Sequence, residues 1–339
     1  MDKNKNFIVS CVGAYADSGI GTGGLVGVKN KEALIIDKID CTGLCQTESM
    51  LYRFVRSKQA IVGYNNQGIK FYLKLPETVD VHDILIENNT IVCIATGNNE
   101  ILWFDPHGKF LKKWKAEGEG DAWHLNCLLS IEGDLYISAF GEFQSHREWL
   151  GQSHQTGFIM NLESGQKVMT ELCGPHTPRF IDNRWVICDS HTKSLVVQTE
   201  GNQKKILQLQ GFTRGLTYDE NYLYVGESAN RKTARKDAYS YITVIDKSNL
   251  EVVERIGVPF PEIYDIILIS DEMADNIFAN TENFLLEEET SRIKALENQV
   301  ERGVKENRNL RRSFYQKTII NRIINRIKNK LKFNSINNR

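Results

Sequence analysis

Three histidines open apolar, strand-like segments at similar intervals along the chain. His82, His124 and His176 lie 42 and 52 residues apart, and Arg214 and Tyr264 open two further segments after intervals of 38 and 50 residues. Neutral imidazole is a common metal ligand, and three convergent histidines suit a divalent ion such as Zn, Mn or Fe with an open coordination position. The alternative is that each histidine hydrogen-bonds a neighbouring strand or water in a polar channel.

The residues at or beside the other lead positions extend this chemistry. Arg214 offers a fork of donors suited to a carboxylate or phosphate, with a salt bridge between repeats as the alternative. Tyr264 and Asp265 supply a phenol and a carboxylate, which makes them candidate catalytic groups for proton transfer. Asn126 is a further ligand-binding candidate, although it could instead, like Asp83, hold neighbouring strands together. Two polar residues in loops add to the ligand-binding set: His191 and Ser228.

Intervals of this size match the blades of a β-propeller, which repeat every 40–50 residues or so. After His82, apolar runs at 91–96, 101–105 and 110–114 are separated by Asn, Gly and Pro, and the later segments repeat this rhythm. The sequence therefore predicts an all-β propeller of six blades. Five or seven blades stay open because the repeat over 44–75 is irregular. The strand at 262–269 is expected to close the ring with strands at 7–12, 24–28 and 33–37.

The lengths of the connecting loops indicate which face of this propeller carries a site. Long loops at 14–23, 141–156 and 227–240 fall on the face where the innermost strands begin, whereas the turns on the other face are short. Binding residues concentrate on long loops held by a rigid scaffold. The loops and the lead residues thus predict a site at the same end of the central channel.

Composition is typical of a soluble globular chain: 339 residues, 41% of them hydrophobic and 25% charged. The seven cysteines are odd in number and contain no CxxC pair, which favours buried free thiols in a reducing compartment. The apolar run at 7–13 is too short for a convincing signal peptide, and it reads well as a strand. We therefore expect a cytoplasmic protein, peripheral at the inner face of the membrane if its tail binds lipid.

The C-terminal part changes from strand to helix periodicity. The sequence divides into a propeller (1–271), a coiled-coil helix (272–310) and a basic amphipathic helix (311–339). Heptad positions define a seam that predicts a homo-oligomer, with packing on the protein's own propeller as the alternative: Leu286, Ile293, Val300, Asn307 and Phe314.

The last segment has a charge of its own. Residues 311–339 contain nine of the 42 basic residues and no acidic ones, so residues 1–310 hold 33 basic and 43 acidic residues, a balance of −10. An apolar face of isoleucines beside lysine and arginine predicts attachment to an anionic membrane, with a protein partner as the alternative. The acidic body argues against nucleic acid as a partner.

Five short motifs resemble those of an uncharacterised bacterial family of predicted β-propellers. They are HDI (82–84), HLN (124–126), PHTPR (175–179), GFTRGL (211–216) and GES (226–228), and the resemblance covers about residues 80–270. Members of that family often accompany glycan-assembly genes, which implies a glycan context without assigning a reaction.

The residues and the resemblance together give one leading interpretation. A histidine-rich central pocket acts on, or binds, a polar and anionic carbohydrate-type small molecule or glycan, as a metal-dependent lyase, hydrolase or epimerase if it is an enzyme. The other interpretation is a non-catalytic scaffold whose tail recruits glycan-assembly enzymes to the membrane. The sequence leaves open whether the protein is an enzyme.

Overall fold

The computed structural model describes residues 5–13, 23–75, 80–198, 203–230 and 238–286. The chain divides into two compact units, Met1–Glu288 and Glu289–Arg339, and all described residues belong to the first. The remainder of the predicted coiled coil and the whole basic helix, residues 287–339, lie outside the described residues.

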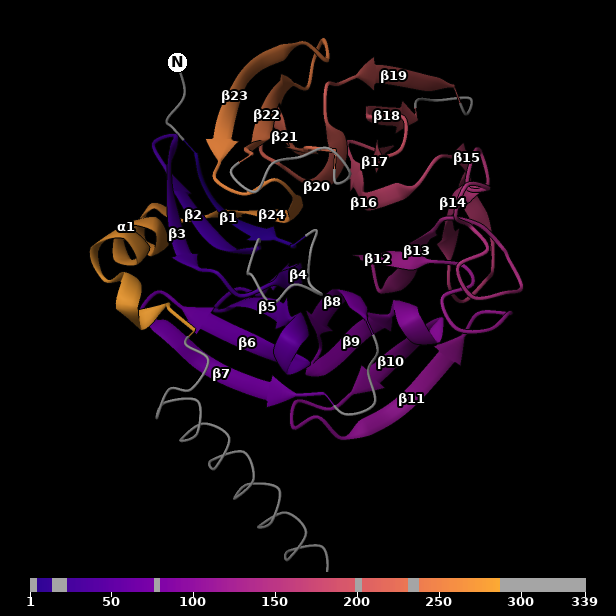
Figure 1. The fold of residues 1–339 in the computed structure, drawn as a ribbon, viewed down its shortest axis with the longest axis horizontal. Helices are drawn as coiled ribbons and strands as arrows, with labels where there is room; N and C mark the ends of the chain where they lie inside the picture. Colours follow the sequence, from indigo (N-terminus) through magenta and orange to yellow (C-terminus); the bar gives the residue numbers. More distant parts are fainter. Residues whose placement is uncertain (1–4, 14–22, 76–79, 199–202, 231–237, 287–339) are drawn as a thin grey trace, which may run out of the picture. The chain divides into compact units, whose positions relative to one another are not determined.

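The first unit is a β-propeller of six four-stranded antiparallel sheets arranged around a central axis (Figure 1). We number these sheets as blades 1 to 6 and give the strands of each from the axis outward. Blade 1 contains β24 (Ile263–Ile269), β1 (Asn6–Cys11), β2 (Gly24–Lys29) and β3 (Glu32–Asp37); blade 2 contains β4 (Cys41–Gln46), β5 (Leu51–Val55), β6 (Ala60–Asn65) and β7 (Gly68–Lys74); blade 3 contains β8 (Val81–Glu87), β9 (Thr90–Ala95), β10 (Glu100–Phe104) and β11 (Phe110–Lys115).

The remaining three blades follow the same order. Blade 4 contains β12 (Leu125–Ile131), β13 (Asp134–Ala139), β14 (Gly157–Asn161) and β15 (Lys167–Leu172); blade 5 contains β16 (Pro175–Ile181), β17 (Arg184–Asp189), β18 (Ser194–Gln198) and β19 (Lys204–Gln208); blade 6 contains β20 (Phe212–Tyr218), β21 (Tyr222–Ser228), β22 (Ser240–Asp246) and β23 (Val252–Val258). The innermost strands β24, β4, β8, β12, β16 and β20 contact one another in succession around the axis.

The ring is closed by the two ends of the propeller sequence, as predicted. β24 pairs antiparallel with β1, with Leu268 opposite Phe7, so blade 1 combines one late strand with three early ones. Blade 2, whose repeat looked irregular in the sequence, has four regular strands. The predicted count of six blades is therefore confirmed. Closure gives blade 1 the same four strands as the other blades, so β24 pairs with β1 instead of remaining a single unpaired strand.

Apolar side chains of neighbouring blades build the core between the sheets. Strand residues alternate between the two faces of a sheet, so each blade can bury apolar residues against both neighbours. One cluster joins Val92 and Ile94 of β9 to Leu128 and Ile137 of the next blade, around Trp123. Tight turns connect the strands, and residues such as Asn88 and Asn89 adopt the left-handed backbone that two-residue hairpins require.

Each innermost strand has a register shift at or next to one residue that points toward the axis. His82, Asn126 and Tyr264 are each skipped in the pairing with the neighbouring strand, which is the pattern of a β-bulge. The shifts in the other three inner strands lie at or beside Thr42, His176 and Arg214. We call these six residues the inner ring: Thr42, His82, Asn126, His176, Arg214 and Tyr264.

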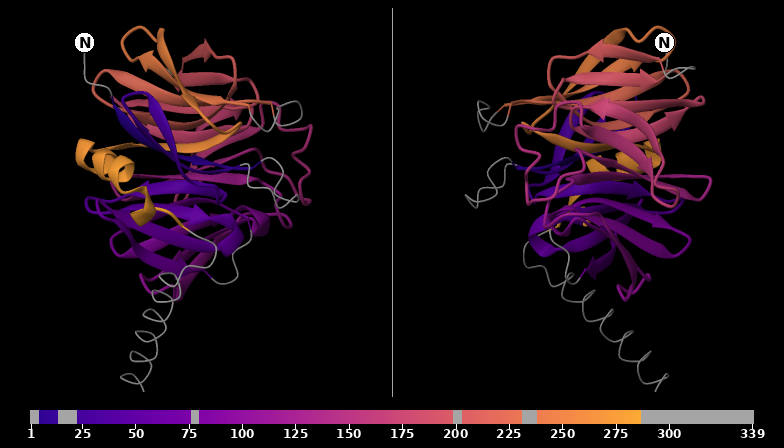
Figure 2. Two further views of the ribbon diagram at one scale, coloured as in Figure 1. Left: turned by 60° about the vertical axis from the view of Figure 1, so that its left-hand side comes forward. Right: turned by 90° about the vertical axis from the view of Figure 1, so that its right-hand side faces the viewer.

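One α-helix follows the last strand within the described residues. α1 (Asp271–Ala279) begins at Ser270, whose hydroxyl accepts a hydrogen bond from Met273 N–H, and it packs on β2 (Figure 2, left). Within the described residues, the predicted helix over 272–310 is interrupted, because α1 ends at residue 279. A 3₁₀ turn (Thr281–Asn283) follows, and Leu286, the first residue of the predicted seam, is buried in the propeller unit with Phe284.

Two further expectations can be compared with the structure. All seven cysteines are free and buried, as predicted. Within the described part of the chain, no helix has the length and apolar character needed to span a membrane.

Candidate functional site

A cavity of about 730 Å³ opens at the end of the channel where the inner strands begin. Arg147, Trp149 and Leu150 line it from the 141–156 loop, and Ala229 and Asn230 line it from the loop after β21. The cavity therefore lies on the face that the loop lengths predicted. Four of the six inner-ring residues line it directly: Thr42, His82, Arg214 and Tyr264.

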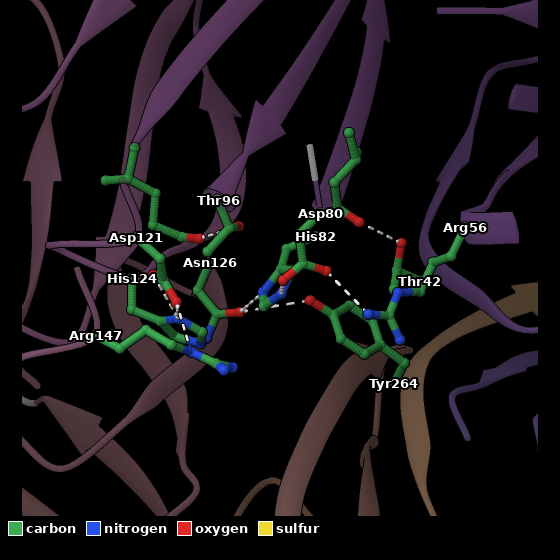
Figure 3. A network of polar contacts seen from close by, with 12 residues as sticks. Thr42, Arg56, Asp80, His82, Thr96, Asp121, His124, Asn126, Arg147 and Tyr264 are labelled. Carbon is green, nitrogen blue, oxygen red and sulfur yellow. Dashed lines mark hydrogen bonds and ion pairs between the residues drawn. The ribbon is translucent and has the colours of Figure 1, made fainter. Parts of the chain in front are cut away.

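Asn126 organises the floor of this cavity (Figure 3). Its Nδ2 donates to the carbonyl oxygen of Pro175 at 3.0 Å, which directs Oδ1 toward Nδ1 of His82 at 3.1 Å and the hydroxyl of Tyr264 at 3.5 Å. Because a carboxamide oxygen only accepts, Nδ1 of His82 must carry a proton. Asn126 is fully buried, so it acts on the cavity through His82 and Tyr264 rather than by contact with a ligand.

The second nitrogen of His82 faces a carboxylate. Nε2 lies 3.4 Å from Oδ2 of Asp80, whose other oxygen accepts from Nη2 of Arg56 at 3.0 Å. Burial alone would raise the pKa of Asp80, but the hydrogen bond and charge of His82 and the charge of Arg56 outweigh it and hold the pKa well below its usual range. Both ring nitrogens of His82 thus face hydrogen-bond acceptors.

His124 has a different environment although its ring lies beside His82. Its Nδ1 lies 2.9 Å from Oδ1 and 3.2 Å from Oδ2 of Asp121, and the ring packs between Phe140 and Trp149 with centroids 4.3 and 4.2 Å away. Burial lowers the pKa of His124 to about 4, against the opposing effect of Asp121. His124 is therefore a neutral imidazole that donates from Nδ1 and keeps an acceptor lone pair on Nε2.

The structure corrects the alignment of the histidines. Asn126, not His124, has the place in blade 4 that His82 has in blade 3, because each is the bulged residue of its inner strand. His124 lies two residues earlier, at the position of Asp80 in blade 3 and Glu262 in blade 1. The backbones of His124 (φ 51°) and Asp80 (φ 51°) are left-handed, a conformation that histidine and aspartate adopt more readily than most residues.

Three arginines line the cavity, and each pairs with a carboxylate. Arg214 Nη1 lies 2.7 Å from Glu262 Oε1, and Arg147 Nε lies 3.5 Å from Asp121 Oδ2. The arginine is the more exposed member in both pairs: 13% against 3% for Arg214 and Glu262, and 53% against 4% for Arg147 and Asp121. The third arginine, Arg56, is about as exposed as its partner Asp80. The cavity wall therefore presents three guanidinium groups, and two of their carboxylate partners, Asp80 and Glu262, line it as well.

The predicted proton-transfer pair is divided between two cavities, because Tyr264 lines both of them whereas Asp265 lines only the second. Tyr264 lines the cavity, and burial raises the pKa of its phenol well above the usual range, so it is a neutral donor. Asp265 lines a separate cavity of about 210 Å³ beneath the inner ring, where Oδ2 accepts from the N–H of Leu44 at 3.3 Å. Successive strand residues point to opposite faces, which explains why the two side chains diverge.

The remaining predicted residues are placed as follows. His191 lines the cavity, with Nδ1 3.3 Å from Oγ of Ser153. Ser228 also lines it, and its hydroxyl donates to the carbonyl of Ile263 at 3.2 Å, which joins blade 6 to blade 1. His176 is buried, and its Nδ1 donates to the carbonyl oxygen of Gly174 at 2.9 Å. Burial and the charge of Arg214 lower the pKa of His176 well below its usual range, so it is neutral.

With this geometry known, comparison with other proteins assigns the family. The chain matches the domain of unknown function DUF4915 over residues 50–278. It belongs to that family. None of the curated proteins compared with the chain matches it.

Solved structures similar to this DUF4915 chain show the fold alone. A protein of unknown function from Bacteroides caccae is 15% identical with a TM-score of 0.57, covering 79% of this chain and 100% of its own. A nidogen/laminin complex gives 11% identity and a TM-score of 0.57, with 78% and 98% covered. Regucalcin from Agrobacterium tumefaciens, a calcium-binding protein, gives 12% identity and a TM-score of 0.50, with 71% and 86% covered.

The three histidines do not fit the three-ligand metal centre that their spacing suggested. Among the residues that the structure describes, no group of three or more His, Cys, Asp or Glu side chains is placed to hold a metal ion. His176 is buried and does not line the cavity, and His124 belongs to a different ring position from His82. The polar groups of this cavity are instead arginine–carboxylate pairs and three histidines, of which His82 and His124 lie side by side in unlike environments.

Sequence reasoning missed several residues of this cavity. Asp80, Asp121, Arg147 and Trp149 all take part in it, yet none occupies a lead position. A signal for part of this set exists: residues two before the inner ring include Asp40, Asp80 and Glu262. For Asp80 and Glu262 that signal was already present in the sequence, because His82 and Tyr264 are lead residues, whereas for Asp40 it requires Thr42 to be recognised as a ring residue.

Proposed function

We propose that the central cavity binds a polar, anionic carbohydrate-type ligand, as a small molecule or as part of a glycan. The observation that carries this proposal is the set of three guanidinium groups on the cavity wall, each anchored by a more deeply placed or shared carboxylate: Arg56, Arg147 and Arg214. An arginine fork recognises carboxylate or phosphate oxygens through two parallel hydrogen bonds, which combines charge with orientation.

Aromatic side chains in the same wall favour a sugar over a simple anion. Trp149, Phe140, Phe212 and Tyr264 line the cavity beside the arginines. A pyranose ring has an apolar C–H surface and a rim of hydroxyl groups, so it requires apolar and hydrogen-bonding surfaces side by side. A cavity of about 730 Å³ has room for one or two such rings. The resemblance to propellers that accompany glycan-assembly genes supports the same ligand class.

The proposal is tested by measuring how much the ligand's carboxylate contributes to binding. We would titrate the full-length protein with glucuronate and galacturonate, and with glucose and galactose, which differ from them only at that group. The acids should bind at least about tenfold more tightly, since a hydrogen bond to a charged group is worth roughly 1.5–3 kcal/mol. Arg147→Gln should remove most of this preference while leaving the affinity for the neutral sugars unchanged.

Arg184→Gln is the matched control. Arg184 is the first residue of β17, on the face of the propeller away from the cavity. Its guanidinium lies 4.0 Å from the carboxylate of Asp182, and its side chain is exposed. Its replacement should change neither affinity. Equal binding of acids and neutral sugars by the unaltered protein would contradict the proposal, as would an acid preference that survives in Arg147→Gln.

A further inference from the structure

We propose that His124 and His82 form a catalytic acid–base pair that eliminates an oxygen substituent from a uronic acid unit by proton transfer on one face of the sugar. This inference rests on the proposed function and deepens it, because it assigns a reaction to the bound anionic sugar. Four observations support it: how His124 is held, how His82 is held, how the two rings lie, and where Arg147 sits.

His124 is arranged as a general base. The carboxylate of Asp121 fixes the proton on Nδ1, so Nε2 carries the lone pair, and the left-handed backbone of His124 turns its ring into the cavity wall. Phe140 and Trp149 pack against the ring and fix its orientation. The indole N–H of Trp149 also donates to the backbone carbonyl of Asp121 at 3.1 Å. Asp121 is thus a positioning residue for His124. The left-handed backbone of His124 is a local strain, and backbone strain concentrates at functional sites.

His82 is arranged as the matching acid. Asn126 requires a proton on Nδ1, and Nε2 faces the carboxylate of Asp80, so both ring nitrogens are placed as donors. An imidazole that accepts at Nε2 beside one that is placed to donate is the combination that acid–base catalysis needs, and unlike environments for two similar groups indicate their separate roles.

The two rings lie edge to face on one wall of the cavity, with centroids 5.0 Å apart (Figure 3). Arg147 is beside them: it contacts Asp121, and its guanidinium lies over the Trp149 ring at 5.9 Å. A substrate carboxylate bound by Arg147 therefore lies next to His124. The carbon that bears this carboxylate is then within reach of Nε2 of His124. The charged groups around His124 are His82, Asp121, Arg147 and Arg214.

The proposed step balances as follows. Nε2 of His124 takes the proton from the carbon next to the carboxylate, and the electron pair of that C–H bond forms a double bond to the neighbouring carbon. The bond from that carbon to its oxygen substituent breaks, and the departing oxygen takes both electrons and the Nε2 proton of His82. Solvent returns the proton from His124 to His82. Since both histidines occupy one wall, the elimination is syn, and epimerisation, which needs groups on opposite faces, is excluded.

The experiment follows oligosaccharides of galacturonate and of glucuronate, linked through O4, with the full-length protein in D₂O. NMR would detect the unsaturated uronate, deuterium at the carbon next to the carboxylate, and any epimer. The unaltered protein should give the unsaturated product. His124→Gln should lower turnover by at least about 100-fold while binding persists, because a general base contributes roughly 10²–10⁴-fold. His107→Gln, in an exposed turn between β10 and β11, is the control.

The variant Asp121→Asn distinguishes a catalytic role of His124 from a merely structural one. Asp121 opposes the effect of burial on His124, so its loss should lower the pKa of His124 further and move the acidic limb of the kcat profile to lower pH. We expect kcat to fall at least about tenfold with little change in KM. A variant that merely loosened the fold would lose kcat without moving that limb.

The possible outcomes separate the two proposals. If uronates bind but the unaltered protein produces neither deuterium exchange nor elimination, the acid–base pair is refuted while the binding function stands, and the protein is then the non-catalytic alternative. Formation of an epimer would refute the same-face geometry. If no uronate binds in preference to its neutral sugar, the proposed function fails, and this inference fails with it.

Discussion

Oδ2 of Asp83 accepts a hydrogen bond from the backbone N–H of Leu128, on the next inner strand, at 2.8 Å. Asp265 makes the same contact with Leu44 at the junction of blades 1 and 2. The two carboxyl groups therefore hold neighbouring blades together beneath the inner ring, on the side away from the candidate site. Asp83 thus has the strand-holding role expected of it, whereas Asp265 shares that role instead of a catalytic one.

The first prediction concerns how the contribution of Asp83 to the stability of the fold depends on pH. Burial and the Asp265 carboxyl raise the pKa of Asp83 to about 8. Between an unfolded pKa of about 3.9 and that value the folded state binds more protons, so this group's contribution to stability is lost as pH rises. Asp83→Asn cannot ionise and keeps an oxygen for Leu128. Its stability relative to the unaltered protein should therefore rise by roughly 3–4 kcal/mol between about pH 5 and pH 8, measured by urea denaturation. Asp182→Asn, in an exposed turn, should show no such trend.

The second prediction concerns the protonation of His124. Its lowered pKa of about 4 means that the ring should stay neutral, with the proton on Nδ1, throughout the range in which a free histidine titrates near 6.5. The unfolded chain binds the extra proton first, so this group's contribution to stability is present above about pH 6.5 and is lost as pH falls toward 4. ¹⁵N NMR of the imidazole nitrogens would check this. A His124 signal that titrates above pH 6 would contradict the buried geometry.

The third prediction concerns a fully buried ion pair between blades 1 and 2. Both guanidinium nitrogens of Arg53 contact the carboxylate of Asp37, and both side chains are excluded from solvent. Arg53→Met leaves Asp37 as an unpaired buried charge and should cost about 3–5 kcal/mol in urea unfolding. Adding Asp37→Asn should recover part of that loss. Lys113→Met, which breaks an exposed contact with Glu100, should cost less than about 1 kcal/mol.

The fourth prediction concerns the C-terminal segment, which lies outside the described residues. Deleting 311–339 should abolish sedimentation with anionic liposomes, because that segment carries the basic and apolar residues of the predicted amphipathic helix. Deleting 289–339 should in addition convert an oligomer to a monomer, as measured by analytical ultracentrifugation, if the heptad seam pairs chains.

The truncation must begin after residue 286, because Phe284 and Leu286 are buried in the propeller unit and Leu286 N–H lies 3.4 Å from Asp37 Oδ2. Replacing Ile323 and Ile327 with Asp should release the protein from liposomes at low salt, while Lys317→Gln alone should weaken attachment only slightly. Attachment that survives deletion of 311–339 would place the membrane contact elsewhere.

The sequence by itself determined the propeller. Turn residues between apolar runs recur with the length of a blade, and strand alternation leaves few other ways to bury those runs, so the six blades and their closure by β24 and β1 follow from local patterns. It also predicted the end of the channel at which the cavity lies, because the long loops fall on that face. Arg214, Tyr264, His191 and Ser228 were placed at the cavity by the same reasoning.

Only the tertiary structure decided which residues of the site contact one another. The equivalent residues of β8 and β12 are those skipped at the β-bulges, His82 and Asn126, and the sequence does not show where the bulges lie, so the match of His124 with His82 was two residues out of register. The pairing of Arg214 with Glu262, 48 residues apart, depends on the closed ring bringing blades 6 and 1 together. Burial then makes His124 neutral beside His82, because desolvation depends on which side chains surround a group in space and not on its neighbours in sequence.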